Sequence, residues 1–136
     1  CDDLQAIIDD ACAQLDEINM EIDEYQNAVY TAYDNQEVAN EAVIDAQSVV
    51  DSIYASIDGL DPDSPDYEIQ LYELNNTLGF AESDLSAANA NLTVATAAVA
   101  TAEAQYTFYS NNVQGFIAAL NASITAAAQA LANAGC

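Results

Sequence analysis

The sequence predicts an all-α fold: a long antiparallel two-helix coiled-coil hairpin, which we expect other chains to complete into a bundle. Two patterns predict it. Apolar residues recur at alternating steps of three and four along both halves of the chain, which places them in one stripe along a helix. Gly and Pro are scarce, at four and two residues, so the turns that a β architecture needs are missing. The 136 residues are enough for one domain.

The first predicted helix covers residues 3–59. Its apolar stripe, at heptad positions a and d, is called the first seam, and Gln36 is its only polar residue. With Ile8 at position a, every acidic residue of this helix except Glu21 lies at positions b, c or f, on the outward face. The first seam consists of Leu4, Ile8, Ala11, Leu15, Ile18, Ile22, Tyr25, Val29, Ala32, Gln36, Ala39, Val43, Ala46, Val50, Ile53, Ile57 and Leu60.

Residues 60–64 form the predicted turn, and the second predicted helix covers residues 65–134. Gly59 is suited to cap the end of the first helix. Ser64 followed by Pro65 is a typical helix start, because Ser caps the free amides and Pro fits the first helical position. Helices joined by so short a connection are antiparallel neighbours.

The second helix has a stripe of its own, the second seam, in which only Ser123 is polar. Symmetric pairing about the turn places Cys1 opposite Ile124, so that roughly the last dozen residues overhang the first helix. The second seam consists of Tyr67, Leu71, Leu74, Leu78, Ala81, Leu85, Ala88, Leu92, Ala95, Val99, Ala102, Tyr106, Tyr109, Val113, Phe116, Leu120, Ser123, Ala127, Ala130 and Ala134.

The second half of this helix is almost uncharged, since Glu103 is the only side-chain carboxylate from Leu85 onward. Further apolar residues lie off the second seam there, and three of them recur every seven residues. A two-helix hairpin cannot cover both the second seam and this additional apolar stripe, so we expect this face to pack against another chain. The predicted partner-docking residues are Phe108, Ile117, Ile124 and Leu131.

The charge is one-sided: 23 acidic residues and no Lys, Arg or His give a formal net charge of −23. No side-chain salt bridge can form within the chain, and its carboxylates repel one another. Nucleic acid and anionic lipid surfaces are excluded as electrostatic partners, because both attract Lys and Arg. Catalysis is not expected either, because the sequence has no phosphate-binding glycine loop, no nucleophile motif and no basic side chain.

The acidic turn is the one candidate metal site, since oxygen-rich loops suit Ca²⁺. Its spacing departs from the EF-hand pattern, because Pro65 stands where a ligand is expected and the defining Gly is absent. The same acids also suit the capping of two helix ends, and no other cofactor is expected. The candidate ligands are Asp58, Asp61, Asp63 and Asp66.

Three cysteines occur, at positions 1, 12 and 136, and an odd count in a secreted chain implies a modified, free or intermolecular thiol. The start Cys1-Asp2-Asp3 resembles the mature N-terminus of a bacterial surface lipoprotein, in which the first Cys carries lipid. That resemblance implies lipidation of Cys1 and attachment to a membrane, which leaves Cys12 and Cys136 to form a disulfide. A bond between Cys1 and Cys136 stays an alternative.

These patterns predict a non-catalytic structural or assembly protein of the bacterial cell surface, the outer membrane or an extracellular complex. Its partners are other protein chains, in a homo- or hetero-oligomer, and it docks through the uncharged Ala-rich helical face. The alternatives are an acidic module that binds cations or a basic partner, and a virion or appendage component. Calorimetry with Ca²⁺ separates the first alternative, because tight stoichiometric binding would favour it.

Overall fold

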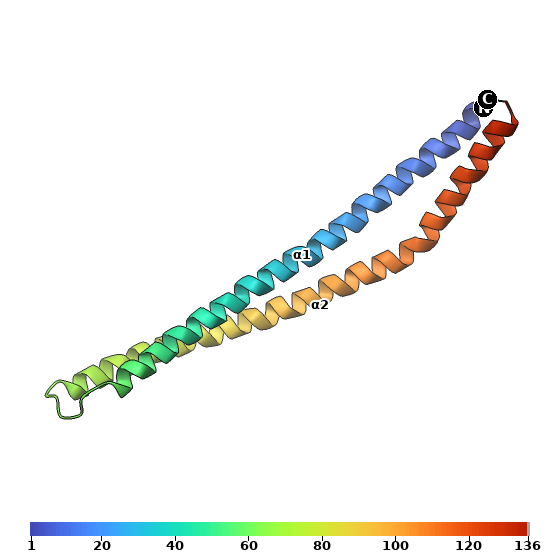
Figure 1. The fold of residues 1–136 in the computed structure, drawn as a ribbon. Helices are drawn as coiled ribbons and strands as arrows, with labels where there is room; N and C mark the ends of the chain where they lie inside the picture. Colours follow the sequence, from blue (N-terminus) through green and yellow to red (C-terminus); the bar gives the residue numbers. More distant parts are fainter. Residues whose placement is uncertain (136) are drawn as a thin grey trace. The chain divides into compact units, whose positions relative to one another are not determined.

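Two helices make up nearly all of the chain in the computed structural model, which describes residues 1–135 (Figure 1). α1 spans Asp2–Asp58 and α2 spans Tyr67–Asn133, and the described residues contain no strand. The two helices pack against each other, so the predicted all-α helical hairpin is confirmed.

The chain forms two compact units, each built from one segment of α1 and one segment of α2. The loop unit is Thr31–Val99 and includes the connection between the helices. The terminal unit is Cys1–Tyr30 together with the chain from Ala100 onward. Within each unit the two segments run antiparallel, because residues later in α1 meet residues earlier in α2.

α1 runs for 57 residues without a Gly or a Pro. Asp2 and Asp3 in its first turn stabilise the positive end of the helix dipole. Along its outer face, Gln and Asp side chains four residues apart form hydrogen bonds, such as Gln5 Nε2 to Asp9 Oδ1 at 2.9 Å. Each such pair adds a few tenths of a kcal/mol to a helix, roughly 0.2–0.5.

The connection between the helices is held by its own acidic and hydroxyl side chains. The Asp63 amide donates to Asp61 Oδ1 at 3.0 Å, and the Asp66 amide donates to Ser64 Oγ at 3.3 Å. These are the local turns that Asp and Ser favour. The Tyr67 amide donates to the Ser64 carbonyl at 3.2 Å, and this tight turn precedes the helix, so α2 begins two residues later than predicted.

Gly59 does not act as a left-handed glycine cap. α1 ends at Asp58, within one residue of the prediction, and the Gly59 amide still donates to the Ala55 carbonyl at 3.0 Å. Within the described residues, the one positive φ belongs to Gly135, at 75° just past the end of α2. The left-handed glycine of this chain therefore follows the second helix.

In the loop unit, every residue of both predicted seams is buried or half-buried. The centre of the packing is Val50, Ile53 and Ala81. Ala81 and Ala88 are at most 9% exposed, and their small side chains let the two segments approach closely. Partly buried neighbours complete the cluster: Ile57, Leu78 and Leu85.

The pairing in the loop unit is not symmetric about the turn. Symmetry places Tyr54 opposite Leu71, but the Tyr54 hydroxyl donates to Glu82 Oε1 at 2.9 Å, about three helical turns further along α2. Few residues of α1 follow Tyr54, whereas many residues of α2 precede Glu82, so α2 begins beyond the end of α1. The half-buried Leu60 of the connection lies at this extension.

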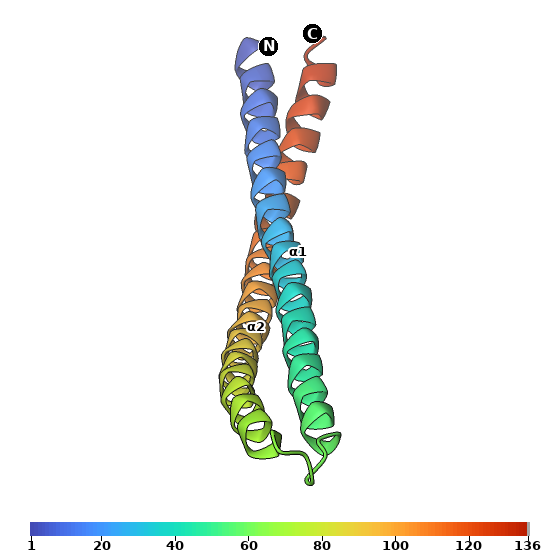
Figure 2. The ribbon, with the colours of Figure 1, turned by 90° about the vertical axis from the view of Figure 1, so that its left-hand side faces the viewer.

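The predicted overhang of the last dozen residues is wrong. In the terminal unit, Cys1 and Gln5 line one surface hollow together with Leu131 and Ala132. The start of α1 and the end of α2 lie side by side in both views (Figures 1 and 2). The asymmetric pairing explains this, because α2 already extends past α1 at the connection and has no excess length left here.

The second seam changes position in the terminal unit. It follows the prediction as far as Val113, but Phe116 is 67% exposed and Ser123 is also exposed. Ile117 and Ile124 are half-buried in their place. The packed stripe thus moves from heptad positions a and d to positions a and e, and the predictions that Phe116 and Ser123 belong to the seam are wrong.

α2 bends where this change occurs, within its orange-to-red part (Figure 1). The Asn112 side chain donates Nδ2 to the Phe108 carbonyl at 2.7 Å. Side-chain bonds of this kind to the carbonyl one turn back compete with the backbone hydrogen bond. Beyond the bend, Ile117 rather than Phe116 lies on the packed side.

The core is thin in both units. Among the described residues, no side chain is less than 2% exposed, and five of the nine buried residues are alanines. Two helices can cover only one stripe of each other, so the larger seam residues stay half-buried. A third or fourth helix would be needed to enclose them.

Candidate docking surface

The acidic turn does not form a metal centre. Within residues 1–135, no three carboxylate, Cys or His side chains come together in a way that could hold a metal ion. Asp58, Asp61, Asp63 and Asp66 are therefore not assembled, and the Asp61 side chain accepts the Asp63 amide instead. Asp61 thus bonds the backbone of the turn, as the other interpretation of these acids expected.

The cysteines are only partly described. Cys12 has a free, exposed thiol on α1. The predicted bond between Cys12 and Cys136 is therefore wrong, because the Cys12 thiol has no disulfide partner; Cys136 itself lies outside the described residues. Cys1 immediately precedes α1, and its carbonyl accepts the Gln5 amide at 3.1 Å, so the helix starts directly after the predicted lipidation site.

The predicted docking residues separate into two groups. Phe108 is 73% exposed, as a docking residue should be. Ile117, Ile124 and Leu131 are half-buried, because the rotated seam of α2 turns them inward. Phe116 is the exposed apolar residue that sequence reasoning placed in the seam instead.

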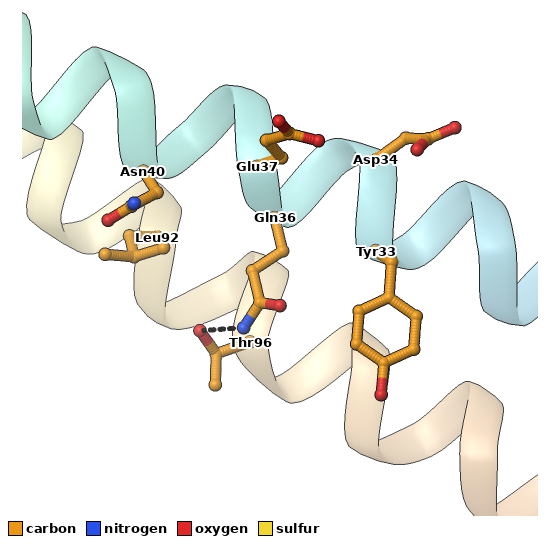
Figure 3. A pocket seen from close by; sticks show the side chains of 7 residues that line it. All are labelled: Tyr33, Asp34, Gln36, Glu37, Asn40, Leu92 and Thr96. Atoms are coloured by element: carbon orange, nitrogen blue, oxygen red, sulfur yellow. Dashed lines mark hydrogen bonds between the residues drawn. The ribbon is translucent and has the colours of Figure 1, made fainter.

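A polar hollow of ≈ 500 Å³ lies on one side of the loop unit (Figure 3). Gln36 reaches across it and donates Nε2 to Thr96 Oγ1 at 3.2 Å, so the one polar seam residue of α1 is hydrogen-bonded to α2. Asp34 and Glu37 point away from the hollow into solvent (Figure 3).

Two tyrosine–glutamate pairs join the helices. In the terminal unit, the Tyr109 hydroxyl donates to Glu21 Oε2, and the rings of Tyr25 and Tyr109 stack with centroids 4.7 Å apart. The hydrogen bond to Glu21 raises the pKa of Tyr109 to about 12, with smaller contributions from burial and nearby negative charge. The hydrogen bond to Glu82 likewise raises the pKa of Tyr54. In each unit such a pair links α1 to α2.

An uncharged groove of ≈ 420 Å³ lies between the two helices of the loop unit. Val38 and Val94 stand in it 66% and 70% exposed. None of its lining residues carries a charge. The lining of the uncharged groove is Asn35, Val38, Ala39, Ala42, Asn91, Val94, Ala95 and Ala98.

Sequence reasoning noted Val94 as an apolar residue off the seam but did not identify this groove. The signal was present in the chain, because residues 35–42 and 91–98 share the spacing Asn-x-x-Val-Ala-x-x-Ala. A search for repeats between the two helices, rather than along each seam, finds it.

α2 also contains a window of eighteen residues with a mean hydropathy of 1.4, of which 6% is buried. By length and composition alone, this helix could cross a membrane. The core helix of a soluble protein also passes this test of length and composition.

The fold and surface define an acidic helical hairpin with an uncharged groove and exposed apolar side chains. Comparison of the chain with protein-family models, with curated proteins and with solved structures found no match. Its function is therefore inferred from the surface alone.

Proposed function

We propose that this protein is a non-catalytic assembly subunit that docks onto other protein chains through the uncharged side of its helices. The carboxylates stay in solvent and keep the assembly soluble, while neutral side chains form the contacts. Docking of this kind gives shape-based association that does not depend on opposite charges.

One observation carries the proposal: each unit has exposed apolar side chains on α2. In the loop unit, Phe80 and Val94 share heptad position c and are 76% and 70% exposed, and in the terminal unit Phe108 is 73% exposed. Exposed aromatic side chains on a helix surface are typical of protein interfaces. The thin core supports the same proposal, because additional helices would cover the half-buried seam residues.

The proposal includes a setting at the cell surface or in an extracellular complex. A chain with 23 acidic residues and no Lys or Arg gains solubility in an exposed, salty medium and offers trypsin no cleavage site.

Gel filtration with light scattering tests the docking itself. At micromolar concentration and about 1 M NaCl, where the Debye length is about 3 Å, we expect a species larger than a monomer. High salt removes the repulsion between acidic chains and leaves contacts between neutral surfaces intact. A monomer under these conditions would argue against assembly through the uncharged side.

A further inference from the structure

The uncharged groove has an internal symmetry. α1 and α2 each contribute four residues, Asn, Val, Ala and Ala, at the same spacing, and the two segments run antiparallel in the loop unit. A local two-fold axis through the groove therefore exchanges Val38 with Val94 and Asn35 with Asn91. The symmetry comes from two different stretches of one chain.

We propose that a second copy of this chain occupies the uncharged groove with its own uncharged groove, forming a four-helix homodimer. This inference rests on the proposed function and deepens it by naming the partner. A two-fold dimer needs a surface that is complementary to itself. The uncharged groove meets this need because its pattern already repeats about a two-fold axis. The four lining residues of each helix would face an equivalent set of four in the second copy.

The charges favour a second copy over a basic partner. The groove carries no charge, whereas Asp34 and Glu37 line the separate polar hollow and face solvent (Figure 3). A basic protein would be attracted to such carboxylates and would gain no charge pairing in the groove. A second chain with a net charge of −23 can approach closely only where both surfaces are neutral, and the groove is such a surface.

The shapes of the lining residues also fit self-association. Val38 and Val94 project into the groove, and the alanines one position and four positions further along leave space beside them. Projecting side chains of one copy can enter the spaces of the other, as in coiled-coil packing. Asn35 and Asn91 each carry a donor and an acceptor, so their amides can pair with the same residue type across a two-fold axis and fix the register.

The groove alone is smaller than a stable interface, which buries about 800 Å² per partner. By heptad count, the same side of the helices also carries Val49 and Phe80, which are 52% and 76% exposed, with Asp45 and Asp84 beside them. Val49 lies one heptad after Ala42, and Phe80 lies two heptads before Val94. We therefore include both residues in the interface.

The test compares two double variants by sedimentation equilibrium at about 1 M NaCl, where added charge is screened. Val38→Asp with Val94→Asp places carboxylates in the groove. Ile44→Asp with Ile69→Asp is the matched control: it adds the same charge to the same two helices at positions 59% and 62% exposed, away from the groove. All four sites are exposed, so both variants should keep the helical circular dichroism of the wild type.

We expect a wild-type mass of two chains, a dissociation constant raised by about 100-fold or more in the groove variant, and a change of less than about threefold in the control. Val38→Ser with Val94→Ser removes the apolar contacts without adding charge and should raise the constant about tenfold. Equal effects of the groove and control variants would overturn the inference.

The outcomes also separate this inference from the proposed function. An oligomer that survives the groove variant, or one with a mass other than two chains, overturns the groove dimer and leaves assembly through another part of the uncharged side standing. A wild-type monomer overturns both.

Discussion

At the scale of single residues, the Tyr109–Glu21 pair explains the one exception in the charge pattern. Glu21 is the only acidic residue of α1 outside the outward positions, and it accepts a hydrogen bond from Tyr109 of α2. The periodicity of the sequence flagged Glu21 as unusual, but it could not name the partner. The partner depends on the asymmetric pairing, which periodicity does not encode.

The raised pKa of Tyr109 predicts a loss of stability at alkaline pH. A group whose pKa is higher in the folded state stabilises the fold below its unfolded pKa, about 10 for Tyr, and this contribution is lost as pH rises through the folded value of about 12. We expect the thermal midpoint of the wild type to fall across this window. Tyr109→Phe should be less stable at neutral pH and should lose less over the same window.

Circular dichroism melts at successive pH values measure this, and Tyr30→Phe is the control, since Tyr30 is 56% exposed and accepts a hydrogen bond from Gln26 of the same helix. Identical pH profiles for Tyr109→Phe and the wild type would show that the Tyr109–Glu21 bond does not contribute.

Gln36 is a second residue whose effect can be predicted. It is the one polar residue of the first seam, and its amide bonds Thr96 at the half-exposed edge of the packing. Gln36→Leu should stabilise the hairpin by about 1 kcal/mol, because an apolar side chain there gains burial and Thr96 can bond to water. Urea denaturation gives the free energy of unfolding, and a destabilised variant would mean that the bond to Thr96 outweighs the gain in burial.

At the scale of the helices, the sequence predicted the packed stripes well where each helix is regular. All of the first seam is buried or half-buried, and so is the second seam as far as Val113. The prediction failed beyond that residue because a fixed heptad was extended through a bend. Ser123 was a warning in the sequence, since Ile124 beside it is the better core residue.

The change of seam position beyond Val113 predicts that substitutions at two neighbouring residues differ in their effect on stability. Ile117→Ala should destabilise the protein by about 1–2 kcal/mol, because Ile117 is half-buried. Phe116→Ala removes a larger side chain but should change stability by less than about 0.5 kcal/mol, because Phe116 is 67% exposed. The free energies from urea denaturation would have the opposite order if the unbroken heptad were correct.

The connection between the helices determines a second feature that helical periodicity could not predict, the offset between the two helices. Turn chemistry placed the end of α1 within one residue, but the Ser64 hydroxyl accepts the Asp66 amide in a tight turn before α2 begins. The offset between the helices depends on the path of the connection, and a period of 3.6 residues carries no information about that path. The uncharged groove depends on the same offset, since it brings residues 35–42 beside residues 91–98.

At the scale of the whole molecule, a net charge of −23 without a single Lys, Arg or His dominates the energetics. Folding brings like charges together, so the fold is stabilised by its seams against this repulsion. The pairing of the two helices and the salt dependence of their stability can both be deduced from the sequence. The identity of a partner cannot, because association depends on the three-dimensional arrangement of neutral side chains.

Salt should therefore stabilise the fold. Raising NaCl from about 0.01 M to about 1 M shortens the Debye length from about 30 Å to about 3 Å, and we expect the thermal midpoint to rise by about 5 °C or more. At about pH 2 the carboxyl groups are protonated, so the same salt series should have little effect. A midpoint that is independent of salt at neutral pH would show that the repulsion is unimportant.

The most direct test of assembly through uncharged surfaces is the salt dependence of wild-type association, measured by sedimentation equilibrium from about 0.1 M to about 1 M NaCl. Docking through neutral side chains predicts a dissociation constant that falls as salt rises, because the repulsion between acidic chains is screened while the apolar contacts remain. A dissociation constant that rises with salt would show that charge pairing holds the assembly together and would contradict the account.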